Sequence, residues 1–149
     1  MIQGLYETHI QVRDLEKAVK FYTEVLGLTL AHYDGIRPIA FLWIGDDKKA
    51  MLGLWEQKEN LQKRHFAFRC SQEFILEKAT TFLTDQGLKP YNFLKNGSSE
   101  PMVFAWMPAL ALYFDDADGN QLEFIHVLEG EGQPEHGLVS YPDWLKLKK

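Results

Sequence analysis

The sequence is poor in cysteine and contains no long apolar run. Cys70 is the single cysteine among 149 residues, so no internal disulfide can form, which suits a reducing cytosol. No hydrophobic segment approaches the roughly 18–20 residues of a membrane span. Residues 1–12 lack the basic stretch and the cleavage site of a signal peptide. We therefore expect a cytoplasmic protein with no membrane-spanning segment.

Positive charge is also scarce, which argues against a nucleic-acid partner. The chain has 16 Lys and Arg against 21 Asp and Glu, a formal net charge of −5, and no cluster of basic residues. Hydrophobic residues make up 46% of the chain, an ordinary value for a globular protein. At this length we expect one domain that buries most of its apolar surface.

The pattern of apolar residues predicts a β-α-β-β-β order in the first part of the chain. A short strand at YETHIQV is followed by a helix from Asp14, a good N-cap, to Gly27. Three further strands are predicted at LTLAHYD, IAFLWIG and AMLGLWE.

The same order returns after the polar stretch KENLQK. RHFAFRC predicts a strand, and SQEFILEKATTFLTDQG predicts a helix with Ser71 as N-cap and Gly87 at its end. Three strands are then predicted at LKPYNFL, ALALYF and QLEFIHV. The sequence thus predicts an α+β fold with two tandem βαβββ modules, about 4–57 and 63–128, and a C-terminal arm at 129–149.

Three correspondences suggest that the modules are an internal repeat. His9 and His65 each lead the first strand of a module, and LGL at 26–28 matches QGL at 86–88. The last hairpin of each module is predicted to have the same length, with a constant offset of 70 that makes Gly53 the counterpart of Glu123. The second module also carries about ten additional residues, which lie within the stretch KNGSSEPMVFAWMP. Its prolines argue against a central strand there, and its apolar residues suggest either a lid or a dimer contact.

Strand alternation places several polar residues on one face of the predicted sheets. His9, His65 and Glu123 lie opposite the apolar positions of their strands, so they do not face the helices. A carboxylate such as Glu123 within an apolar strand is costly unless something pairs with it. Two histidines and a glutamate have the composition of a metal site, although a salt bridge from Glu123 to Arg69 is the structural alternative.

Two stretches resemble a known superfamily. HIQVRDLEKAVKFYTEVLGL resembles the opening strand and helix of vicinal-oxygen-chelate proteins, and DADGNQLEFI resembles their closing hairpin. This superfamily includes glyoxalase I, fosfomycin-resistance thiol transferases, extradiol dioxygenases and bleomycin-binding proteins. The resemblance implies paired modules that form a cupped mixed sheet with the helices outside, a divalent metal and a homodimer. By position, His9, His65 and Glu123 match the metal ligands.

The resemblance also implies roles for other residues. Tyr113 matches a tyrosine of the fosfomycin-type enzymes and is the candidate catalytic residue, whereas Glu129 stands where those enzymes carry an arginine. The fourth glyoxalase I ligand is missing if Gly53 is the counterpart of Glu123, and Glu56 has the wrong strand parity to replace it. Candidate substrate-binding residues are Trp43, Trp55, Arg69 and Trp106, although ordinary aromatic packing explains the tryptophans equally well.

Two classes of function fit these expectations. The first is a metal-dependent enzyme that chelates a small oxygen-rich substrate, of the lyase, thiol transferase or dioxygenase type. Its ligand set without thiolate is compatible with Fe, Mn, Ni, Co or Zn. The second is a metal-free binding module of the bleomycin-resistance type.

Overall fold

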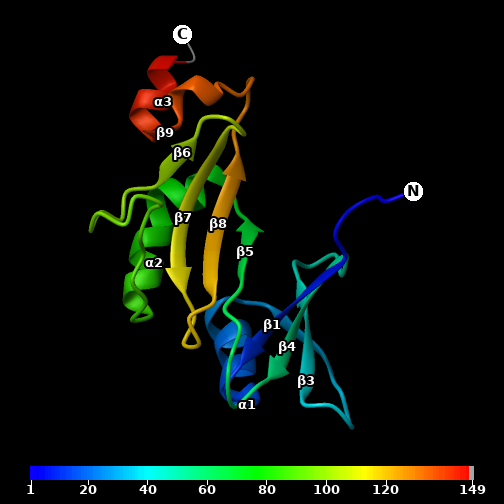
Figure 1. Cartoon of the computed structure of the whole chain (residues 1–149). Coiled ribbons are helices and arrows are strands. Elements are labelled where there is room, and N and C mark those ends of the chain that lie inside the picture. Colours follow the sequence, from blue (N-terminus) through cyan, green and yellow to red (C-terminus); the bar gives the residue numbers. More distant parts are fainter. Residues whose placement is uncertain (148–149) are drawn as a thin grey trace. The chain divides into compact units, whose positions relative to one another are not determined.

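The computed structural model describes residues 1–147 and divides into two compact units. Residues 1–64 together with 118–120 form the first unit. The second unit comprises residues 65–117 and the described chain from 121 onward. Each unit contains one sheet with helices, so the predicted α+β fold of two modules is confirmed (Figure 1). Among the described residues, no helix has the length and apolarity needed to cross a membrane.

The first unit has the predicted element order. Its sheet has the strand order β1-β4-β3-β2, in which β1 runs parallel to β4 and the other pairs are antiparallel. The elements are β1 (Glu7–Val12), α1 (Leu15–Lys20), the π-helical segment η1 (Phe21–Val25), β2 (Thr29–Tyr33), β3 (Ile39–Ile44) and β4 (Ala50–Glu56).

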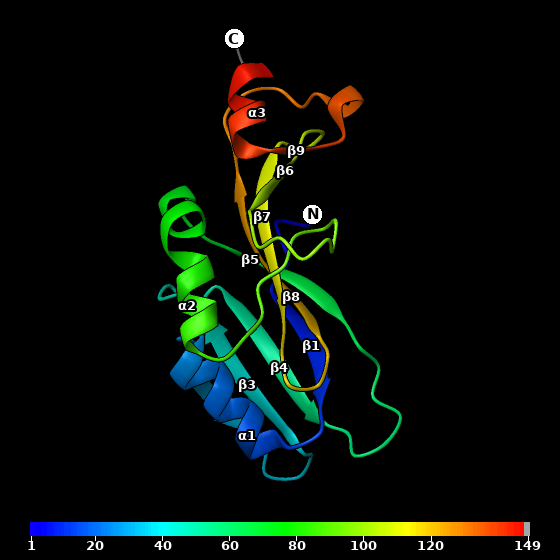
Figure 2. The same cartoon turned by 90° about the vertical axis from the view of Figure 1, so that its left-hand side faces the viewer.

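Local sequence signals set the limits of the helical segment formed by α1 and η1. The Asp14 carboxylate accepts a hydrogen bond from the Lys17 amide at 3.0 Å, and Gly27 ends the helical segment with a φ of +79°. The apolar face of the sheet packs against α1, which lies along β4 and β3 (Figure 2). The fully buried side chains on this face of the sheet include Ile10, Val12, Leu42, Leu52 and Leu54.

The second unit contains more elements than its sequence pattern predicts. Its sheet has the order β5-β8-β7-β6-β9, with β5 parallel to β8. The elements are β5 (His65–Arg69), the π-helical segment η2 (Phe74–Lys78), α2 (Ala79–Asp85), β6 (Met102–Phe104), β7 (Ala109–Asp115), β8 (Gln121–Val127), the 3₁₀ turn η3 (Pro134–His136), β9 (Leu138–Ser140) and α3 (Tyr141–Leu147).

Two predictions for this unit are wrong. LKPYNFL forms no strand, and only an isolated bridge joins Tyr91 to Tyr113. The strand that pairs with β7 is instead β6, which lies within the additional stretch of residues 95–108, in spite of its prolines. Pro101 precedes β6 and Pro108 follows it, so neither occupies a ladder position.

The C-terminal arm belongs to the second unit. Its strand β9 pairs antiparallel with β6, and α3 lies at the same end of the sheet (Figures 1 and 2). Trp144 of α3 is 1% exposed, and Gln72 donates a hydrogen bond to the Tyr141 hydroxyl at 2.8 Å. The arm therefore docks on its own chain.

Candidate functional site

In the second unit, His65 and Glu123 point toward each other from neighbouring strands. His65 pairs with Gln121 across β5 and β8, and Glu123 lies two residues further along β8 on the same face. The His65 Nε2 atom is 3.1 Å from the Glu123 Oε1 atom. These two candidate ligands therefore lie next to each other within this unit.

The hydrogen bonds of His65 determine which nitrogen faces the carboxylate. Its Nδ1 atom lies 3.0 Å from the carbonyl oxygen of Gln121, which can only accept, so Nδ1 carries a proton. In the neutral ring, Nε2 then presents a lone pair to Glu123. A metal-ligating histidine commonly donates its other ring N–H to a backbone carbonyl in this way.

Glu123 is a buried carboxylate. It is 4% exposed, and burial raises its pKa, against the opposing effects of His65 and of a hydrogen bond from Tyr113. The Tyr113 pKa is raised as well, chiefly by burial and then by the nearby Glu123 charge. Tyr113 is 5% exposed and lies directly opposite Glu123 on β7, so the candidate catalytic tyrosine contacts the candidate ligand.

The separation of the His65 and Glu123 atoms fits a bound divalent cation. Two ligands at right angles, each about 2.1 Å from an ion, are about 3.0 Å apart. The observed 3.1 Å between a nitrogen lone pair and a carboxylate oxygen matches this value. As far as the described residues go, no third His, Cys, Asp or Glu side chain completes a metal-holding group within either unit. The predicted three-residue site, which includes His9 of the first unit, stays a prediction.

A polar network continues from this pair along the same face. The Tyr91 hydroxyl donates to Asp115 at 2.5 Å and accepts from Gln121 at 3.2 Å, and the Tyr91 ring stacks on Tyr113 at 5.8 Å. Burial raises the Tyr91 pKa to about 12. A cavity of about 460 Å³ begins at this edge and is lined by Tyr91, Asp115, Lys89, Lys95 and the chain around them. The sequence pattern does not reveal this wall, because it predicts a strand at Tyr91 that does not form.

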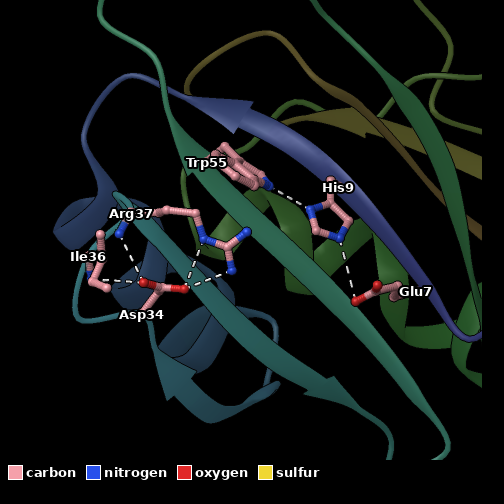
Figure 3. Close-up of polar contacts among 6 residues, drawn as sticks. All are labelled: Glu7, His9, Asp34, Ile36, Arg37 and Trp55. Atoms are coloured by element: carbon pink, nitrogen blue, oxygen red, sulfur yellow. Dashed lines mark hydrogen bonds and ion pairs between the residues drawn. The ribbon is translucent and has the colours of Figure 1, made fainter.

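In the first unit, His9 has different partners. Its Nδ1 atom accepts a hydrogen bond from the Trp55 indole nitrogen at 2.6 Å, and its Nε2 atom lies 3.5 Å from a Glu7 carboxylate oxygen (Figure 3). The Phe41 ring meets the imidazole edge-on at a centroid distance of 5.8 Å. A cavity of about 250 Å³ adjoins His9 and Trp55 and is also lined by Gln11, Gln57 and Arg64.

The strand register corrects the predicted correspondence between Gly53 and Glu123. His9 pairs with Gly53 and Trp55 lies two residues further on, just as His65 pairs with Gln121 and Glu123 lies two residues further on. The counterpart of Glu123 is therefore Trp55. The two hairpin connections have the predicted equal length, since Ile44 lies opposite Ala50 and Asp115 lies opposite Gln121, a separation of six residues in each. The predicted offset of 70 is wrong because His9 pairs with β4 three residues beyond the start of that strand, whereas His65 pairs with the first residue of β8.

The other candidate residues have defined positions. The register places Trp43 and Trp55 on the same face as His9, and Glu56 on the opposite face, where its carboxylate accepts the Leu15 amide at 3.0 Å. The predicted parity of Glu56 is thereby confirmed. Arg69 is exposed on β5, and Trp106 is 61% exposed in the turn after β6. The roles of Trp43, Arg69 and Trp106 in substrate binding stay predictions.

Comparison with known proteins agrees with this architecture. The integron cassette protein HFX_CASS4, from the mobile metagenome of the Halifax Harbour sewage outfall, is 36% identical over 84% of this chain and 99% of its own, with a TM-score of 0.70. Oxidase ChaP-H2 is 19% identical over 89% of this chain and 100% of its own, with a TM-score of 0.68. Lactoylglutathione lyase from Agrobacterium tumefaciens is 18% identical over 84% and 94%, with a TM-score of 0.64. The last two similarities show the fold alone.

A search of curated proteins finds no match. The sequence profile of one family, however, matches residues 4–124, which is most of the chain and includes all the predicted ligands. The chain therefore belongs to the Glyoxalase/Bleomycin resistance protein/Dioxygenase superfamily.

Proposed function

We propose that this chain is a metal-dependent enzyme that acts on a small, oxygen-rich molecule, with His65 and Glu123 among its metal ligands. The observation that carries the proposal is the 3.1 Å approach of the His65 Nε2 atom to a carboxylate that is 4% exposed. Two acceptor atoms at this distance repel each other unless a proton or a cation lies between them. A divalent cation would satisfy both acceptors and, when bound, would polarise the oxygens of a substrate.

The residues around the pair have roles that follow from their contacts. The Gln121 carbonyl fixes the His65 ring with its Nε2 lone pair toward Glu123, and the Tyr113 hydroxyl donates to the same carboxylate. Because the Tyr113 pKa is raised, the hydroxyl keeps its proton at neutral pH and acts as a hydrogen-bond donor. Substrates that fit this wall have a planar part that can lie beside Tyr91.

Metal titration tests the proposal directly. After dialysis against a chelator, the parent protein is titrated with Mn²⁺ and with Ni²⁺ by calorimetry. Glu123→Gln and His65→Gln should each weaken binding by at least tenfold, since removing a ligand costs more than the 10–100-fold loss seen for second-shell partners.

His126→Gln is the matched control. His126 lies on the same sheet, and its Nδ1 atom lies 2.9 Å from the Cys70 carbonyl oxygen, as the Nδ1 of His65 does from Gln121. The His126 side chain lies on the opposite face of β8 from Glu123, so His126→Gln should leave the metal affinity unchanged. The proposal would be refuted if the parent protein bound both metals more weakly than a micromolar dissociation constant. Equal losses of metal affinity in Glu123→Gln, His65→Gln and His126→Gln would refute it as well.

A metal-free binding module is the second candidate, and the contacts of His9 favour it. Both ring nitrogens of His9 already have protein partners, and its neighbours Trp55 and Phe41 form an aromatic wall. In such a module a protonated His65 would form an ion pair with Glu123. The metal titration described above also distinguishes the two candidate functions, because a metal-free binding module takes up no metal.

A further inference from the structure

Trp55 occupies the position in the first unit that Glu123 occupies in the second. Each side chain lies two residues beyond the ladder partner of a histidine, on the same face of a parallel strand pair. Each also contacts that histidine, Glu123 through a carboxylate oxygen and Trp55 through an indole N–H. The surroundings of the two histidines are thus built alike, and they differ in whether the neighbour of the histidine accepts or donates a hydrogen bond.

This difference reverses the tautomer of the histidine. The Trp55 indole nitrogen can only donate, so the His9 Nδ1 atom at 2.6 Å accepts and carries no proton. In the neutral ring the proton of His9 is therefore on Nε2, the nitrogen that faces Glu7. His65 has the opposite arrangement, with its proton on Nδ1 and its lone pair on Nε2. A metal needs the lone pair, whereas a protonated Nε2 suits a carbonyl or carboxylate oxygen.

The surroundings of His9 hold the ring in contact with Trp55. A Cβ atom on Gly53 would lie 2.7 Å from the His9 Nδ1 atom and 2.9 Å from its Cε1 atom, so only glycine lets the ring lie across β4 at this point. The Phe41 ring meets the imidazole edge-on, with the ring planes at 85°. Gly53 and Phe41, themselves ladder partners, thus both contact the imidazole.

The indole itself is held by the β2–β3 connection. The Arg37 guanidinium carbon lies 5.4 Å from the centre of the Trp55 ring, a cation–π distance. Asp34 fixes this guanidinium with hydrogen bonds of 3.0 and 2.7 Å and also accepts the amides of Ile36 and Arg37 (Figure 3). These backbone amides, together with the guanidinium, hold the Asp34 pKa well below its usual range. Asp34 is therefore ionised at neutral pH and keeps Arg37 beside the indole.

We infer that Trp55 is a positioning residue that replaces a metal-ligating carboxylate and holds His9 in the Nε2–H tautomer, so that His9 donates a hydrogen bond to a ligand oxygen and does not bind a metal. The His9 side chain is 36% exposed, which leaves Nε2–H accessible once the exposed Glu7 carboxylate moves aside. The inference concerns the first unit only, and it stands whether or not His65 and Glu123 bind a metal.

Nitrogen-15 NMR of the histidine rings tests the tautomer. At pH 8, long-range proton–nitrogen spectra of the metal-free parent should show the neutral ring of His9 as Nε2–H and that of His65 as Nδ1–H. Trp55→Phe keeps an aromatic ring and removes the donor, so the His9 signals should shift toward the Nδ1–H pattern. Trp43→Phe changes the other tryptophan of the same face and should leave both histidines unchanged. An Nδ1–H signal for His9 in the parent, or no change in Trp55→Phe, would overturn the inference.

A gain-of-binding experiment gives a second readout. Trp55→Glu is made in a Glu123→Gln background, so that the proposed second-unit site is disabled and cannot contribute. If Trp55 occupies a ligand position, the introduced carboxylate should raise Ni²⁺ affinity at least tenfold over Glu123→Gln alone. His9→Gln added to this protein should abolish the gain. Unchanged Ni²⁺ affinity in a folded Trp55→Glu protein contradicts the assigned correspondence, and the NMR result on Trp55→Phe decides the matter if that variant fails to fold.

Discussion

Gly53→Ala should destabilise the first unit because the new methyl group would collide with the imidazole of His9. The nearest ring atom is 2.7 Å from the added carbon, closer than real Cβ contacts, so the ring or the strand has to move. The lost hydrogen bond between His9 and Trp55 costs about 1 kcal/mol, and overpacking costs about 1–3 kcal/mol. Replacing glycine within a strand returns about 0.5–1 kcal/mol. The expected net loss is about 1–3 kcal/mol in the free energy of unfolding.

Urea denaturation of a double-mutant cycle measures this effect and assigns its cause. The four proteins of the cycle are the parent, Gly53→Ala, His9→Ala and the double variant. With a slope of about 1–3 kcal/mol per molar urea, the midpoint of Gly53→Ala should fall by about 1 M. In a His9→Ala background the same change should be neutral or stabilising, because the colliding ring is gone, which gives a coupling of about 1–3 kcal/mol. Gly4→Ala is the control, since no atom lies within 4 Å of its added Cβ. A coupling near zero would refute the placement of the His9 ring over Gly53.

Three further predictions follow from other parts of the chain. Burial raises the Cys70 pKa to about 11, so at pH 8 its thiolate fraction should be about a hundredfold below that of a thiol with the ordinary pKa of 9.0. The rate at which iodoacetamide alkylates Cys70 should therefore keep rising up to about pH 11. Trp144→Ala should cost about 3–5 kcal/mol of stability in thermal or urea unfolding, because the side chain is 1% exposed, whereas Leu145→Ala, at 44% exposure, should cost much less. Turnover of the methylglyoxal–glutathione hemithioacetal should be absent or very weak, because the ligand position of the first unit holds Trp55, whose indole cannot accept a proton. Robust turnover that is lost in Glu56→Gln would show that Glu56 is the fourth ligand after all.

A homodimer is also expected, since two-fold dimers are the commonest oligomers and the superfamily resemblance implies one. Light scattering at micromolar concentration should give about twice the mass of the 17.3 kDa chain. A monomeric mass under these conditions would contradict the expectation.

The features that sequence predicted well are those set by local chemistry. Capping by Asp14 and Ser71, the helix ends at Gly27 and Gly87, and the strands with clear alternation all form as expected. Face assignments within a strand were equally reliable, because they depend only on alternation. Alternation alone places His65 and Glu123 on the face away from the helices, and the pairing of β5 with β8 then brings them together.

The features that sequence predicted poorly depend on pairing between strands. The equivalence of Gly53 and Glu123 requires the first strand of each module to pair at the same distance from the hairpin turn. That distance differs between the units because it is decided by cross-strand packing, which no single strand reveals. Tyr91 was placed in a strand by its apolar neighbours, although the chain makes only one bridge there. The donor role of Trp55 toward His9 could be recognised only once the register was known.

The pairing of β9 with β6 has a consequence for how the chain can be shortened. Strand β6 is short and apolar, with Met102, Val103 and Phe104, and β9 occupies the side of it that faces away from β7. Trimming the chain before Leu138 would leave those backbone amides and carbonyls as an open template for other chains. Such a truncated protein should self-associate through the exposed edge of β6. The C-terminal arm therefore protects the protein from aggregation, in addition to contributing Trp144 to the core.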